Sequence, residues 1–208
     1  DRCRYEICMK SYHRLTERGQ ARRLRPLAWK ALEQYDLDVL RLSLVTNDMN
    51  GIFRVDTRSG EKWILRVTFP EGGHNRDHVA AEMDWLAALA RETDLSIPRP
   101  LPARNGELVV EAGAPGVPEA RLCAIFSWVP GTDLAEHLSP ANMSRLGELM
   151  AKLHAHALTY SPPAELSLMQ RPQTMCLPIW REAGKAVRWR KTSPRPPFIM
   201  KPVEAVPA

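Results

Sequence analysis

A chain of 208 residues with 44% hydrophobic and 25% charged residues has the composition of one folded domain, or of one domain with a further fragment, which excludes disorder over its whole length. Charges interrupt the apolar runs well before the roughly 18 residues that a membrane span needs, and the first residues are charged rather than typical of a signal peptide. We therefore expect a cytoplasmic protein with no membrane partner. The four cysteines, Cys3, Cys8, Cys123 and Cys176, form no C-x-x-C pair, so neither a zinc site nor a disulfide framework is predicted.

The net charge of +5 is unevenly distributed along the chain. Residues 1–30 hold nine Lys/Arg against three Asp/Glu, and residues 168–208 hold eight against two. Residues 31–167 therefore carry a net charge of −7. Because the region that looks folded is acidic, the basic isoelectric point does not favour nucleic-acid binding, although two functional basic arms are kept as an alternative.

A helix is predicted from Thr16 to Tyr35, because its apolar residues recur at intervals of three and four. Pro26 weakens this prediction for the first half of the helix, since proline removes a backbone donor. The recurring apolar positions are Leu24, Leu27, Ala28, Ala31 and Leu32.

Three strands are predicted to follow, over residues 39–45, 51–56 and 62–69. Turn-forming residues separate them, with Asn47 to Gly51 in the first connection and Thr57 to Gly60 in the second. The simplest arrangement is three antiparallel strands joined by tight hairpins.

A second helix is predicted from His74 to Arg91, where apolar residues again follow the helical period. Two further strands are predicted over residues 107–112 and 121–129, around a connection rich in Gly and Pro. A third helix is predicted to begin with Ser139 as the N-cap and Pro140 at the first helical position, and to end near Leu158. His74 and His78 lie four residues apart, but no third ligand accompanies them, so no metal site is predicted.

The last 41 residues, from 168 to 208, have a different character. They hold seven of the 18 prolines, no Asp and no sustained hydrophobic period. A basic, Pro-rich segment of this kind is not expected to pack a core.

Six short strings follow one another in an order that resembles the aminoglycoside phosphotransferase family, whose small-molecule kinases include homoserine kinases and choline kinase-like proteins. They are Phe53–Val55, Trp63–Val67, Ala81–Leu86, Ile97–Pro100, Asn105–Val109 and Phe126–Gly131. The similarity covers about residues 30–165.

The resemblance implies an α+β, protein-kinase-like fold. Residues 31–129 are then the N-lobe, an antiparallel five-stranded sheet plus a helix, and residues 130–167 are the hinge and the first helix of the C-lobe. Residues 1–30 form a basic N-terminal segment with a helix. Residues 168–208 are an irregular Pro/Arg-rich tail, either disordered or translated from a non-native frame.

The same resemblance implies a site for ATP. Arg66 would contact the phosphates and Glu82 would be its partner, in the way that a strand lysine pairs with a helix glutamate in kinases. Ordinary surface charges are the alternative for both residues. Asn50 belongs to the loop in the place of the glycine-rich phosphate loop, where a plain hairpin turn is the alternative. The backbone of Ser127, Trp128 and Val129 would form the hinge that meets adenine.

A catalytic His-x-Asp-x-x-x-x-Asn loop and a second metal-binding Asp are implied after the third helix. None of the six histidines is followed two residues later by Asp, and no Asp follows Asp133. We therefore expect a chain truncated before the catalytic loop, without catalytic residues or Mg²⁺ ligands, that is inactive on its own. His154 and His156 are expected to serve packing or polar capping at the end of the third helix.

The predicted function is that of a kinase that uses ATP and Mg²⁺ to phosphorylate a hydroxyl of a small molecule. A non-catalytic nucleotide-binding or regulatory module and a basic nucleic-acid-binding protein are the two alternatives. The acceptor is not predicted, because in this family the large lobe determines it.

Overall fold

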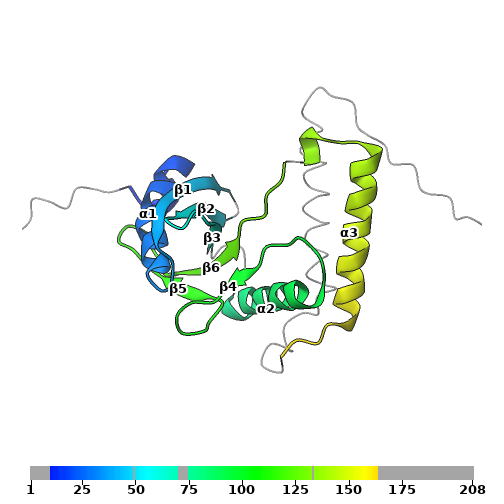
Figure 1. Cartoon of the computed structure of the whole chain (residues 1–208). Coiled ribbons are helices and arrows are strands. Elements are labelled where there is room, and N and C mark those ends of the chain that lie inside the picture. The colour runs from blue at the N-terminus through cyan, green and yellow to red at the C-terminus, as the bar shows by residue number, and fades with distance from the viewer. Residues whose placement is uncertain (1–9, 49, 70–74, 133, 164–208) are drawn as a thin grey trace, which may run out of the picture. The chain divides into compact units, whose positions relative to one another are not determined.

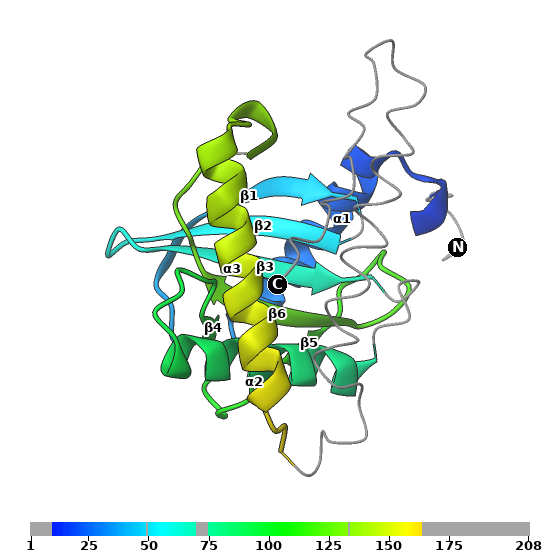
Figure 2. The same ribbon diagram turned by 90° about the vertical axis from the view of Figure 1, so that its right-hand side faces the viewer.

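The computed structural model describes residues 10–48, 50–69, 75–132 and 134–163 (Figure 1). Its strands form one antiparallel sheet in the order β1-β2-β3-β6-β4, and β5 also pairs with β6 (Figure 2). The elements in chain order are the short 3-10 helix η1 (Tyr12–Arg14), α1 (Glu17–Leu32), β1 (Val39–Asn47), β2 (Asn50–Thr57), β3 (Lys62–Thr68), α2 (Arg76–Glu92), β4 (Pro100–Leu101), β5 (Val110–Ala112), β6 (Arg121–Ser127), the 3-10 helix η3 (Leu134–Glu136) and α3 (Pro140–Thr159).

Helix α1 runs without interruption through Pro26, so the weakness expected in its first half is absent. Its start is capped by Thr16, whose side-chain oxygen accepts from the backbone N–H of Gly19 at 3.3 Å. Pro26 lies on the exposed side of the helix, while Leu24 and Leu27 on the opposite side are fully buried. Burial of that apolar side compensates for the missing backbone hydrogen bond.

The two faces of the sheet pack against different helices, because successive side chains of a strand point to opposite faces. On one face, Phe53, Val55 and Leu65 join the buried side of α1 in the main core. On the other face, residues of α2, of β6 and of the segment just before β5 form a second, smaller apolar cluster: Val79, Met83, Val109, Ala124 and Phe126. Side chains of β3 that point away from α1 therefore face α2.

The α+β class and the kinase-like arrangement are confirmed, with one strand more than the five expected. The added strand β4 has two residues and pairs with Ile125 and Phe126 of β6. The strand predicted from residue 107 begins only at Val110, because residues 103–107 form a turn in which Gly106 has a φ of +86°. Both differences from the prediction concern short strands, β4 and β5, which pair with the same side of β6.

Helix α3 begins as predicted, with the hydroxyl of Ser139 accepting from the backbone N–H of Asn142 at 3.1 Å. Its expected apolar side is only half-buried, and Met143 is exposed. None of the helices in the described ranges is long and apolar enough to cross a membrane. His74 and the tail from residue 168 lie outside the described residues.

Candidate functional site

Arg66 lies in the middle of β3, between Ile52 of β2 and Ala124 of β6, on the sheet face that is turned toward α2. Its guanidinium donates two parallel hydrogen bonds to Glu82 of α2, from Nη1 to Oε1 and from Nη2 to Oε2, each at 2.7 Å. The Arg66 side chain is 15% exposed and that of Glu82 is 34% exposed. The structure therefore brings the two residues together in the bidentate geometry that favours arginine over lysine.

Phe126 of β6 forms a support for this ion pair. The guanidinium carbon of Arg66 lies 5.2 Å from the centre of the Phe126 ring, within the range of a cation–π interaction. Arg66 Nε is buried and finds no hydrogen-bond partner among the residues that the structure describes. Sequence reasoning assigned no role to Phe126, because its position beside Arg66 depends on the pairing of β3 with β6, two strands that are far apart in the chain.

Asn50 lies at the start of β2 opposite Thr68 of β3, so it shares the α2-side face with Arg66. The next residue, Gly51, is turned toward α1, where an added Cβ would lie only 3.0 Å from a methyl group of Leu24. On the same side, the Asn47 amide donates to the backbone carbonyl of Glu17 at 3.4 Å. The hairpin is thus attached to α1 on one face, and Asn50 is presented on the other.

The three predicted hinge residues differ in how their backbone groups are used. The N–H of Ser127 donates to the carbonyl of Arg99 at 2.9 Å, and its hydroxyl accepts from the N–H of Arg99 at 2.9 Å. The N–H of Trp128 donates to the carbonyl of Lys62 at 3.1 Å. Among the described residues, the N–H of Val129 has no such partner. It is therefore the backbone donor that this segment leaves available.

The predicted hinge lies beside β3, the strand that carries Arg66. Ser127 is paired with Trp63, three residues before Arg66 on β3. At about 3.4 Å per residue, that separation is about 10 Å. Asn50, opposite Thr68, lies beyond Arg66 in the same direction. The predicted positions therefore follow one another along β3, from Ser127 beside Trp63, through the ion pair, to Asn50 of the β1–β2 hairpin, and Arg66 and Asn50 share the α2-side face.

No group of three His, Cys, Asp or Glu that could hold a metal ion occurs in the described parts of the chain. The backbone N–H of His78 is bound by the side chain of Asn75 at 2.9 Å, which places His78 in the first turn of α2.

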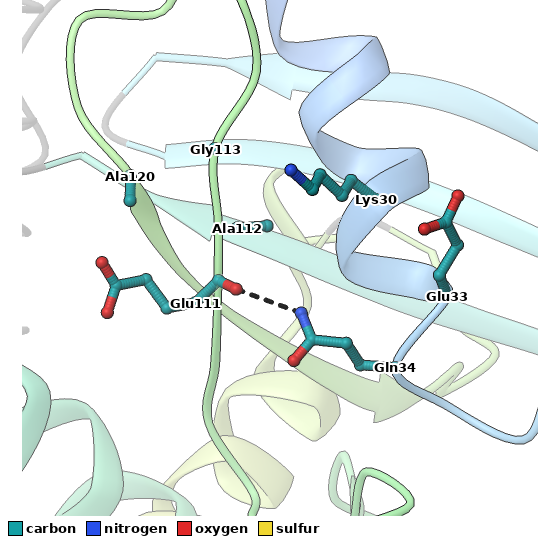
Figure 3. Close-up of a pocket in the computed structure, with 7 residues that line it drawn as sticks. All are labelled: Lys30, Glu33, Gln34, Glu111, Ala112, Gly113 and Ala120. Carbon is teal, nitrogen blue, oxygen red and sulfur yellow. Dashed lines mark hydrogen bonds between the residues drawn. The ribbon is translucent and has the colours of Figure 1, made fainter.

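A pocket of about 560 Å³ lies elsewhere, between the end of α1 and β5 (Figure 3). Gln34 crosses it by donating to the backbone carbonyl of Glu111 at 3.0 Å. This bond satisfies a carbonyl of the short strand β5. None of the predicted site residues lines this pocket. Its lining residues are Lys30, Glu33, Gln34, Glu111, Ala112, Gly113 and Ala120.

An antiparallel sheet with an Arg–Glu pair between its third strand and the following helix has the arrangement of the N-lobe of a protein-kinase-like fold. The chain belongs to the phosphotransferase enzyme family, whose sequence model matches residues 45–196. The resemblance to aminoglycoside phosphotransferases is thereby confirmed.

Several individual proteins are similar to this chain. A solved structure of a microcompartment-associated aminopropanol kinase is 30% identical, with a TM-score of 0.56 over 67% of this chain and 42% of that chain. An amicoumacin kinase in complex with AMP-PNP, Ca²⁺ and Ami is 18% identical, with a TM-score of 0.47 over 62% of this chain and 36% of that chain. An uncharacterised protein of Synechocystis sp. is 26% identical over 133 residues, which are 64% of this chain and 36% of that protein. The chain thus spans less than half the length of each relative.

Proposed function

We propose that the described lobe binds ATP and serves a kinase that transfers the γ-phosphoryl group to a hydroxyl of a small molecule, releasing ADP. The observation that carries the proposal is the bidentate pair of Arg66 and Glu82, which lies between β3 and α2. A carboxylate that holds a guanidinium in place preorganises it to meet a phosphate. Family membership and the 30% identical aminopropanol kinase support the same reaction class.

The roles of the site residues follow from their positions. Val129 would donate its N–H to the adenine edge, with carbonyls of Ser127 and Trp128 as acceptors. Arg66 would contact the phosphates, about 10 Å further along β3. Asn50 would approach the phosphates from the β1–β2 hairpin. Mg²⁺, when bound with ATP, would neutralise phosphate charge, but none of the described residues is assigned to hold it.

We also propose that this chain binds the nucleotide without turning it over. The family's catalytic loop requires an aspartate after the first C-lobe helix, and no Asp follows Asp133. The acceptor is proposed only as a small alcohol. Because the 30% identical neighbour is an aminopropanol kinase, aminopropanol is the first compound to test with a full-length homologue.

Calorimetric titration of the chain with ATP and Mg²⁺ tests the binding proposal. We expect saturable binding that weakens at least tenfold in Arg66→Ala. The matched control is Arg54→Ala, because Arg54 lies on the same face but pairs with Asp56 at 3.0 Å, away from the proposed phosphate position. Equal affinities of the two variants, or no binding by the wild-type chain, would overturn the proposed site. Release of ADP with any acceptor would overturn the proposed lack of turnover.

A further inference from the structure

Helix α2 contacts other elements on two sides, the sheet and helix α3. On one side, Val79 and Met83 pack against Ala124 and Phe126 of the sheet. On the other side, the C-terminal half of α2 contacts the end of α3 through hydrogen bonds. Because α2 carries Glu82, its position decides whether the carboxylate reaches Arg66. The contacts with α3 are therefore relevant to the site even though they lie outside it.

His156 is the centre of these contacts. The indole Nε1–H of Trp85 donates to Nδ1 of His156 at 3.1 Å, and Nε2 of His156 lies 3.0 Å from Oε2 of Glu92. An indole nitrogen can only donate, so Nδ1 must be an unprotonated acceptor. The ring then carries its proton on Nε2 and donates it to Glu92. Trp85 and the side chain of His156 are each 8% exposed, so the bond between them is shielded from water.

Neighbouring groups strengthen the arrangement. The hydroxyl of Tyr160 donates to the carboxylate of Asp84, and its ring stacks on His156 with 5.9 Å between ring centres. Burial, followed by the hydrogen bond to Asp84, raises the pKa of Tyr160, which keeps the hydroxyl protonated as a donor. Hydrogen bonds from Arg91 and then from His156 lower the pKa of Glu92, which keeps it a carboxylate acceptor.

We propose that His156 is a positioning residue, which holds α2 through Trp85 and Glu92 in the place where Glu82 pairs with Arg66. Its effect on nucleotide affinity rests on the proposed function, whereas its effect on α2 does not. Glu82 and Trp85 are three residues apart in one helix and so lie on neighbouring positions of its surface. A shift of α2 that follows loss of the Trp85 bond therefore displaces the carboxylate of Glu82.

Three substitutions separate this role from general packing. His156→Leu removes both hydrogen bonds and leaves the buried indole N–H without an acceptor. His156→Asn retains a carbonyl oxygen that can accept from Trp85. His154→Leu is the matched control, because His154 lies in the same helix two residues earlier and is exposed.

Hydrogen exchange of backbone amides, followed by mass spectrometry, is the readout for α2. We expect exchange over residues 80–92 to be at least tenfold faster in His156→Leu, and within about threefold of the wild type in His156→Asn and His154→Leu. Exchange in β2 and β3 should not change. If His156→Leu does not fold, Trp85→Phe provides the same test, because it removes the indole donor and keeps an aromatic ring. Unchanged exchange in α2 would overturn the proposal.

Nucleotide titration of the same variants connects the helix to the site. We expect at least fivefold weaker ATP binding in His156→Leu and recovery of most of that loss in His156→Asn. Faster exchange in α2 without weaker binding would overturn the connection between His156 and the Arg66–Glu82 pair. Absence of ATP binding by the wild type would instead contradict the proposed function and leave the result on α2 unaffected.

Discussion

The α1 face of the sheet is filled mainly by apolar side chains, whereas the α2 face places an ion pair among a smaller apolar group. Leu24, Phe53 and Leu65 are completely buried on the α1 side. On the α2 side, Arg66 and Glu82 are partly exposed and Phe126 supports the guanidinium. Burial of apolar area is the main source of folding stability, and partly exposed charged groups can meet a ligand. One face therefore mainly stabilises the lobe, and the other carries the charged pair that we propose to meet the phosphates.

The largest effect on the free energy of unfolding is expected when one phenylalanine on each face is replaced by alanine. Phe53→Ala should lower the free energy of unfolding by about 4 kcal/mol, because it opens a cavity in the main core. Phe126→Ala should cost less, about 3 kcal/mol, because the second cluster is smaller and the ring is 7% exposed. Denaturant unfolding measures both. Equal losses, or a larger loss for Phe126→Ala, would contradict the distinction between the faces.

A smaller effect is expected for the ion pair itself. A double-mutant cycle of Arg66→Ala and Glu82→Ala should give a coupling free energy of about 2 kcal/mol, because both hydrogen bonds are short and the guanidinium is mostly buried. The control is a cycle on Arg54 and Asp56, whose two hydrogen bonds are longer, at 3.2 and 3.0 Å, and share one carboxylate oxygen, and for which we expect less than about 1 kcal/mol. Similar couplings in the two cycles would show that the bidentate geometry of Arg66 and Glu82 does not strengthen their pair.

Because a cysteine thiol is buried on the α1 face, we expect the free energy of unfolding to depend on pH in the alkaline range. Burial raises the pKa of the Cys123 thiol to about 12, from an ordinary value of 9.0. Between these two values the folded chain holds a proton that the unfolded chain releases, so the free energy of unfolding falls as the pH rises above 9. We expect a loss of about 1.4 kcal/mol at pH 10 relative to pH 8. In Cys123→Ala this part of the pH dependence should be missing; an identical loss in the variant would assign it to other groups.

The smallest effect is expected at the start of α2. Asn75→Ala should lower the free energy of unfolding by about 1 kcal/mol, because it removes the acceptor for the backbone N–H of His78. Asn75→Asp preserves an acceptor and should change stability by less than about 0.5 kcal/mol. Thermal unfolding of the two variants measures the difference. Equal losses would show that the side-chain cap does not stabilise the helix.

Much of the local structure can be predicted from residue patterns alone. The three hairpin strands, the three helices and the N-cap at Ser139 all lie within a few residues of their predicted positions. Each depends on interactions between residues close in the chain: apolar periodicity, turn-forming residues and capping side chains. Pro26 is the exception, because its local effect is overridden by burial of Leu24 and Leu27 against the sheet.

The candidate site could be predicted only in part. Arg66 and Glu82 follow from the order of motifs in the chain, and the structure brings them together. Phe126 could not be assigned to the pair, because the register between β3 and β6 spans about 60 residues of sequence. The sequence also did not predict that the N–H groups of Ser127 and Trp128 form backbone hydrogen bonds. These bonds leave the N–H of Val129 as the available donor.

By itself, the sequence of this protein determined the elements, their order and the family. The tertiary structure decided which side chains meet: Phe126 with Arg66, and Trp85 with His156. The physical reason is that periodicity and turn chemistry act over a few neighbouring residues, whereas these contacts depend on how sheet and helices pack. His156 illustrates the difference, since its role near the end of a helix depends on an indole 71 residues earlier in the chain.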